Sequence, residues 1–198
     1  MFEWSIGKIR LSVTVPFLAS LLVLMLGDTG SIPLWCVAAS LMHETGHVVA
    51  VLLLEKQPVR VELGIFGMRM LHQDTAGVGY RRKIAVLLAG PVVNLACAAV
   101  LLMAGQAGMI MGVHLVLGLF NLLPIEPLDG GQALLCLLAM RGDIGRAEKT
   151  VFALSLVLLF FLLTGGFYLL LAGGYNFTLL AISLYLSLLI FFKHRKSD

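Results

Sequence analysis

The sequence predicts an all-α membrane protein with six transmembrane helices and a small cytoplasmic β-hairpin or re-entrant loop between the second and third spans. Three observations lead to this prediction. Of the 198 residues, 60% are hydrophobic and only 13% are charged, whereas a soluble domain is roughly a quarter charged. Six apolar stretches approach or exceed the roughly 20 residues that a helix needs to cross a bilayer. The basic residues, finally, fall on one side of the resulting topology.

The apolar stretches are separated by polar segments, and the fourth is longer than the others and contains two prolines. They cover residues 13–27, 33–54, 84–105, 109–140, 150–172 and 177–192. We expect the first stretch to be a retained span rather than a signal peptide, because no convincing small-residue cleavage site follows it. The length suits one integral-membrane domain over residues 1–198.

The positive charges test this span count. With a cytoplasmic N-terminus, all 14 Lys and Arg residues fall on the cytoplasmic side, and the short outer turns contain none. The positive-inside rule predicts this asymmetry. We therefore expect a multi-pass protein of a bacterial-type cell membrane, embedded in the lipid bilayer, with both termini in the cytoplasm. A net charge of +3 gives no indication of nucleic-acid binding.

The polar segment between the second and third spans, residues 56–83, includes a part that favours strands. Apolar and polar side chains alternate for several positions over residues 59–66, which is the pattern of a strand. A free strand edge could pair with an extended substrate, and Phe66 is a candidate substrate contact for this reason. A hairpin lying on the membrane surface explains the pattern equally well.

Three ionisable side chains lie near the middle of the second span, in the sequence HETGH at residues 43–47. His43 and His47 are four positions apart, so both imidazoles lie on one face of a helix. This is the pattern of two zinc ligands with an adjacent glutamate, Glu44, as general base. Ionisable groups at that depth are costly, and ordinary polar packing does not explain three of them together.

A catalytic zinc usually has three protein ligands and an open position for water. The third ligand is expected in the fourth span, where prolines interrupt the sequence NLLPIEPLDGG at residues 121–131. Broken helix at membrane depth is tolerated where it lines a cavity. Asp129 and Glu126 are the two candidates. An alternative is that Asp129 only caps the helix that follows.

Depth favours Asp129. Asp129 lies 12 residues before Arg141, and His43 lies 12 residues before Glu55, so both are roughly 18 Å from the inner ends of their spans at 1.5 Å per residue. We expect Glu126 to face an aqueous cavity instead. His114, in the same span, is expected to be a hydrogen-bonded interior histidine.

Together these motifs resemble the site-2 protease family of intramembrane metalloproteases. The resemblance rests on HETGH at 43–47, on Gly90, Pro91 and Asn94 in the pattern Gly-Pro-x-x-Asn, and on NLLPIEPLDG at 121–130. The three motifs occur in the family's order and span most of the chain from the second to the fourth span.

The resemblance implies a zinc metalloendopeptidase with one zinc ion per chain. His43, His47 and Asp129 would be the ligands and Glu44 the catalytic base. The enzyme would hydrolyse a peptide bond in or near the membrane segment of a membrane-tethered protein. The resemblance also implies that Asn94 and Asn121 lie near the site, where they hold the substrate or support the ligands.

Within that family the chain looks most like the compact sporulation branch, the proteins similar to stage IV sporulation protein FB. The branch suggests a pro-sigma or anti-sigma factor as substrate. No PDZ domain and no nucleotide-sensing CBS domain are expected in residues 1–198. Further partners that we consider are an inhibitory membrane protein and a second copy of the chain. The alternative function is a zinc-binding membrane transporter or sensor without proteolysis, which would not need Glu44.

Overall fold

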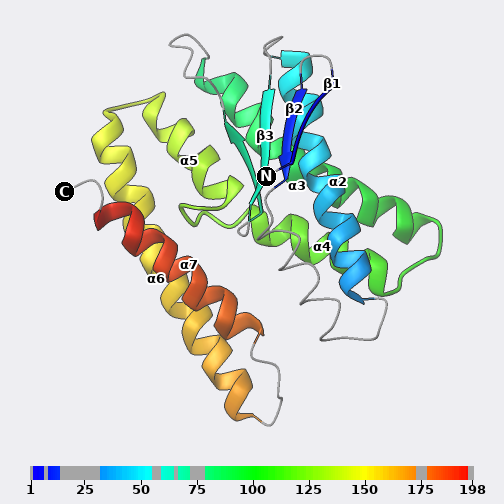
Figure 1. Cartoon of the computed structure of the whole chain (residues 1–198). Helices are drawn as coiled ribbons and strands as arrows, with labels where there is room; N and C mark the ends of the chain where they lie inside the picture. Colours follow the sequence, from blue (N-terminus) through cyan, green and yellow to red (C-terminus); the bar gives the residue numbers. More distant parts are fainter. Residues whose placement is uncertain are drawn as a thin grey trace. The chain divides into compact units, whose positions relative to one another are not determined.

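The structure, a computed structural model, describes residues 2–6, 9–13, 32–54, 59–64, 67–71, 79–172 and 178–195. Two compact units divide the chain, Met1–Phe120 and Asn121–Asp198. The described part contains four strands and six helices (Figure 1). These elements are β1 Phe2–Ile6, β2 Ile9–Val13, α2 Ile32–Leu54, β3 Val59–Gly64, β4 Gly67–Leu71, α3 Tyr80–Met103, α4 Met109–Asn121, α5 Asp129–Ala139, α6 Ile144–Leu171 and α7 Thr178–Arg195.

The four strands form one sheet in the order β1-β2-β3-β4. β1 and β2 pair antiparallel, β2 and β3 parallel, and β3 and β4 antiparallel. In the central pair, Leu11 of β2 lies opposite Val61 of β3. The two N-terminal strands correct the expectation of an all-α fold with strands only between the second and third spans. Val13, taken from the sequence as the start of the first span, is the last residue of β2.

Three described helices are long and apolar enough to cross a membrane, namely α2, α3 and α6. The predicted fourth span is two shorter helices, because α4 ends at Asn121 and α5 begins at Asp129. Pro124 and Pro127 lie in this interruption, where the missing N–H groups and the rigid rings oppose a continuous helix. The count of six spans stays a prediction, since residues 14–27 of the first stretch lie outside the described part.

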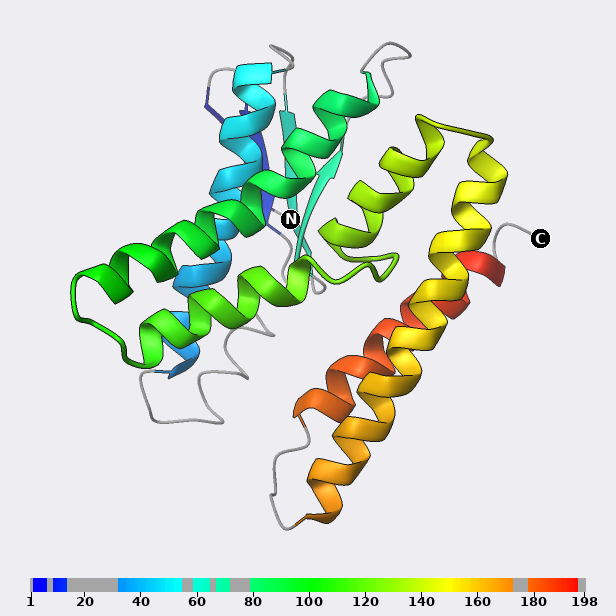
Figure 2. The ribbon, with the colours of Figure 1, turned by 180° about the vertical axis from the view of Figure 1, so that it is seen from behind.

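Small residues let the helices of the first unit approach closely. A Cβ atom added at Gly46 of α2 would lie 2.8 Å from the Ala89 carbonyl oxygen of α3. On α4, a Cβ atom at Gly118 would lie 3.2 Å from the carbonyl oxygen of Pro91 in α3. Figure 2 shows α3 and α4 as the two arms of a helical hairpin. Close backbone approach at small residues is typical of helix packing in membranes, and it makes α3 the central helix of this unit.

In the second unit, α6 and α7 lie side by side (Figures 1 and 2). They approach closely at Gly166, where an added Cβ atom would lie 2.9 Å from the backbone nitrogen of Leu180. Large apolar side chains on α6 remain exposed, among them Phe160, Phe161 and Tyr168. Exposed apolar surface of this extent is typical of contact with a membrane or a partner, which agrees with the length and composition of α6.

Candidate metal centre

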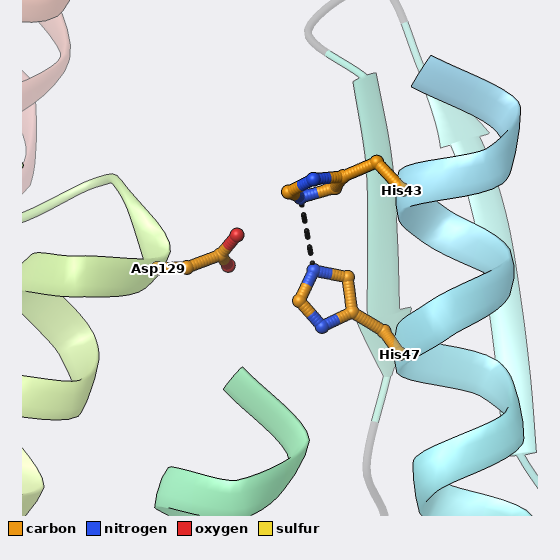
Figure 3. Close-up of side chains that lie close together, drawn as sticks. All are labelled: His43, His47 and Asp129. Carbon is orange, nitrogen blue, oxygen red and sulfur yellow. Dashed lines mark hydrogen bonds between the residues drawn. The ribbon is translucent and has the colours of Figure 1, made fainter. Parts of the chain in front are cut away.

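The two histidines of HETGH lie in the middle of α2 and are both buried, each 4% exposed. Their Nε2 atoms are 3.1 Å apart (Figure 3). Two zinc–nitrogen bonds of about 2.0–2.1 Å at a tetrahedral angle would separate the nitrogens by about 3.3–3.4 Å. The spacing of these two atoms is therefore close to that of two ligands on one metal ion.

A backbone carbonyl of α3 fixes the tautomer of His47 that can bind a metal through Nε2. Its Nδ1 atom lies 2.8 Å from the carbonyl oxygen of Val86. A carbonyl oxygen only accepts hydrogen bonds, so Nδ1 must carry the proton, and the lone pair then lies on Nε2. The bond to Val86 therefore sets both the orientation and the tautomer of His47, as backbone carbonyls do for metal-ligating histidines.

One turn further along α3, Gly90 leaves the room that the imidazoles occupy. A Cβ atom at Gly90 would lie 2.7 Å from Nε2 of His43 and still closer to Nε2 of His47. Any larger side chain would thus collide with the atoms that would bind the metal. This contact gives a physical reason for the glycine of the Gly-Pro-x-x-Asn motif.

A further turn along α3, Asn94 connects His43 to another histidine. The Asn94 side chain is fully buried, and its amide nitrogen lies 3.2 Å from Nδ1 of His43. Its amide oxygen lies 3.2 Å from Nδ1 of His114 in α4, which is 5% exposed. The prediction that His114 is a hydrogen-bonded interior histidine is confirmed. Sequence reasoning missed its partner, because the sequence does not show which turns of α3 and α4 meet.

Val86, Gly90 and Asn94 are spaced four residues apart, so they follow one face of α3. Each supports the histidine pair differently: Val86 through its carbonyl, Gly90 through the absence of a side chain, and Asn94 through its amide. Val86 was missed from the sequence, because every residue has a backbone carbonyl and its side chain carries no signal.

In the second unit, Asp129 is the first residue of α5 and is half-buried. The N-cap position is Leu128, one residue earlier than a capping role for Asp129 would require. The two glycines that follow allow the preceding loop to pack on the first turn of α5. A Cβ atom at Gly130 would collide with the Leu122 carbonyl, and one at Gly131 with the Ile125 carbonyl. This packing determines where α5 starts and so which residue occupies its first position.

Glu126 is buried, at 6% exposure, and is not cavity-facing as expected from the sequence. Its Oε1 atom forms a 2.5 Å ion pair with Nζ of Lys193 on α7. Its backbone N–H donates to Oγ of Ser155 at 2.8 Å, and its carbonyl oxygen accepts from Nε2 of Gln132. The reason for the difference is Lys193, whose positive charge offsets the cost of burying the Glu126 carboxylate. Glu126 thereby anchors the loop before Asp129 to α5, α6 and α7.

In the first unit, His43 and His47 each direct one ring nitrogen toward the other, so the pair could bind a metal ion (Figure 3). Asp129 of the second unit stays the predicted third ligand. Glu44 follows His43 in α2 and is half-buried. Asn121 is the last residue of α4 and is also half-buried. Phe66 lies outside the described residues. The roles of Glu44, Asn121 and Phe66 stay predictions.

Two comparisons with known proteins give matches. Residues 106–164 match the model of Peptidase family M50, and this range includes the interrupted segment and Asp129. The whole chain is similar to the solved structure of the Site-2 Protease from Methanocaldococcus jannaschii, with 20% sequence identity, a TM-score of 0.65, and coverage of 93% of this chain and 92% of that one. This likeness establishes a site-2 protease fold. No curated protein matches the sequence significantly.

Proposed function

We propose that this protein is an intramembrane zinc metalloendopeptidase that hydrolyses a peptide bond in or near the membrane segment of a membrane-tethered protein. The observation that carries the proposal is the buried histidine pair on an apolar helix. Its Nε2 atoms are spaced as two ligands of one metal ion, and Val86 holds His47 in the tautomer that a metal needs. The site-2 protease fold and the match to Peptidase family M50 point the same way.

The proposed ligands are His43, His47 and Asp129, which leave a fourth position for water or substrate. We favour Asp129 over Glu126, because the Glu126 carboxylate is already paired with Lys193. Two imidazoles and one carboxylate are a donor set that zinc accepts in hydrolytic enzymes. The residues present therefore fit the ion.

Bound zinc would supply the Lewis acidity that lowers the pKa of water and polarises the scissile carbonyl. Glu44 accepts the proton of the attacking water and returns it to the leaving amine. The Val86 carbonyl orients the imidazole of His47, and the Asn94 amide contacts the imidazole of His43. Asn121 and Phe66 remain candidate substrate contacts, and Asn121 stands at the end of α4, next to the interrupted segment.

The substrate class follows from the setting of the site. The histidine pair lies in α2, one of three described helices that are long and apolar enough to cross a membrane. A membrane-associated protein is therefore the substrate that reaches the pair most directly. A pro-sigma or anti-sigma factor is the specific substrate that we propose, by similarity to the sporulation branch. An inhibitory membrane protein and a second copy of the chain are the further partners that we propose.

The test is a substitution of Glu44 by glutamine, which keeps the size of the side chain and removes the basic carboxylate. Wild-type and variant proteins are reconstituted in vesicles with a library of tagged single-span peptides, and the products are identified by mass spectrometry. We expect Glu44→Gln to keep its zinc and to lose cleavage by at least about 100-fold, the lower end for loss of a general base.

Zinc content measured on the same samples separates the proposal from its alternative. Zinc bound equally by wild type and Glu44→Gln, with no cleavage by either protein, would favour a zinc transporter or sensor. Cleavage by Glu44→Gln at the wild-type rate would contradict the role of Glu44. Substitution of the neighbouring Thr45 by Ser serves as a control, because Thr45 is exposed and its hydroxyl donates only to the Leu41 carbonyl in its own helix.

A further inference from the structure

We infer that His114 is a positioning residue for the metal: through Asn94, it sets the tautomer in which His43 can bind. The inference rests on the metal site proposed above. Its basis is a continuous line of buried polar groups within the first unit. His114, Asn94 and His43 are 5%, 0% and 4% exposed, and both contacts that join them measure 3.2 Å.

The orientation of the Asn94 amide implies one direction for the hydrogen bonds along this line. Nδ1 of His114 donates to the amide oxygen of Asn94, and the amide nitrogen of Asn94 donates to Nδ1 of His43. The proton of His43 is then on Nε2, which donates to Nε2 of His47. His47 donates in turn from Nδ1 to the Val86 carbonyl. Every donor along the line has an acceptor, so this arrangement is self-consistent.

Metal binding by His43 requires the hydrogen bonds from His114 through Asn94 to His43 to point in the opposite direction. A metal on Nε2 of His43 takes the lone pair there, so the proton of the neutral ring must lie on Nδ1. Nδ1 then needs an acceptor, which is the amide oxygen of Asn94 after a half-turn of the amide. The amide nitrogen of Asn94 consequently faces His114 and needs an acceptor there.

His114 can meet both requirements because a neutral imidazole exchanges its two tautomers. With the proton on Nδ1 it donates to Asn94, and with the proton on Nε2 it accepts from Asn94 through Nδ1. An apolar side chain in its place would leave the Asn94 amide nitrogen buried without an acceptor in the metal-binding arrangement. A buried polar group without its partner is costly, so the metal-binding tautomer of His43 would be disfavoured.

The experiment compares two replacements of His114 by the zinc affinity of the purified protein in detergent, measured by competition with a chromogenic chelator. His114→Asn presents a short amide near the position of Nδ1, and this amide can donate or accept. His114→Leu can do neither. We expect the leucine variant to bind zinc about 10- to 100-fold more weakly, the range for loss of a group that supports a metal ligand. The asparagine variant should bind close to the wild-type affinity.

A second substitution tests the route through Asn94. Asp at position 94 offers only acceptor oxygens, so it can accept from Nδ1 of His43 whatever stands at position 114, as in carboxylate–histidine–zinc arrangements. We therefore expect Asn94→Asp with His114→Leu to bind zinc as tightly as Asn94→Asp alone. A further loss in the double variant would overturn the inference.

Two other results would also overturn it. One is wild-type zinc affinity in a folded His114→Leu protein, and the other is equal weakening by leucine and asparagine, which would mean that His114 acts through packing. If the leucine variant does not fold, His114→Gln replaces it, because its longer side chain carries the amide past the Nδ1 position. A wild-type protein that binds no zinc would contradict the proposed function itself, whereas these comparisons among variants concern only His114.

Discussion

The two units of the molecule position their candidate metal ligands in different ways. In the first unit, His43 and His47 project from a regular helix, and a second regular helix supports them at Val86, Gly90 and Asn94. In the second unit, Asp129 begins a helix directly after an irregular loop. That loop is held by contacts from three different helices.

The difference concerns what kind of sequence change each region tolerates. The histidine pair depends on spacing of four residues along two helices, and on the absence of a side chain at Gly90. The loop before Asp129 depends on one buried carboxylate, Glu126, and on its partner Lys193. Substitutions around the histidine pair should therefore act on metal affinity, whereas substitutions in the loop before Asp129, at Glu126 or at Lys193 should act mainly on stability.

The largest effect is expected for Gly90→Ala. Alanine is the better helix former by roughly 1 kcal/mol, so a loss of function would come from the collision of its Cβ atom with Nε2 of His43 and His47. We expect zinc affinity to fall by more than about 100-fold, the upper end for groups that only support a ligand. Gly112→Ala is the matched control, because a Cβ atom there would meet nothing within 4 Å. Equal zinc affinity of the Gly90→Ala and Gly112→Ala variants would contradict this role of Gly90.

A smaller effect is expected for the ion pair of the second unit. Lys193→Met leaves the Glu126 carboxylate buried without its cation, which should lower the free energy of unfolding by about 1–3 kcal/mol. The side chain of Lys193 is 58% exposed, and solvent screening places the effect in the lower half of that range. Glu126→Gln should cost less, because Lys193 can turn to water and no buried charge remains. The measurement is the free energy of unfolding in mixed micelles. A greater loss of this free energy in Glu126→Gln than in Lys193→Met would contradict our account of the ion pair.

The smallest effect is expected at the start of α6. Asp143 is the N-cap residue, and its side chain accepts from the backbone N–H of Arg146 at 3.0 Å. Asp143→Ala should cost about 1 kcal/mol of stability and leave zinc affinity unchanged. Asp143→Asn, which keeps a capping oxygen, should cost less. A change in zinc affinity in Asp143→Ala would show that the start of α6 contributes to the metal site.

Much of the first region could be predicted from residue types and spacing. Histidines four positions apart in an apolar helix lie on one face whatever the tertiary structure, so HETGH predicted the pairing of His43 and His47. The role of Val86 could not be predicted, because it acts through a backbone carbonyl. The contact of His114 with Asn94 depends on how α3 and α4 align, which Gly118 permits and which helical periodicity does not reveal.

The second region was less predictable because its contacts are distant in sequence. The two prolines predicted the interruption between α4 and α5, but Glu126 was wrongly expected to face an aqueous cavity. Its partner Lys193 lies 67 positions later, in another helix. Strands β1 and β2 were missed for a similar reason, since β2 pairs with β3 from beyond α2.

The most direct test of the central claim is X-ray absorption at the zinc edge of the purified wild-type protein and of the Asp129→Ala and Glu126→Ala variants. For wild type we expect one zinc per chain, two imidazoles, and nitrogen and oxygen ligands at about 2.0–2.2 Å. Asp129→Ala should lose the metal or one oxygen ligand, while Glu126→Ala should keep the wild-type spectrum. A sulfur ligand at about 2.3 Å, a single imidazole, or an unchanged spectrum in Asp129→Ala would contradict the site described for this protein.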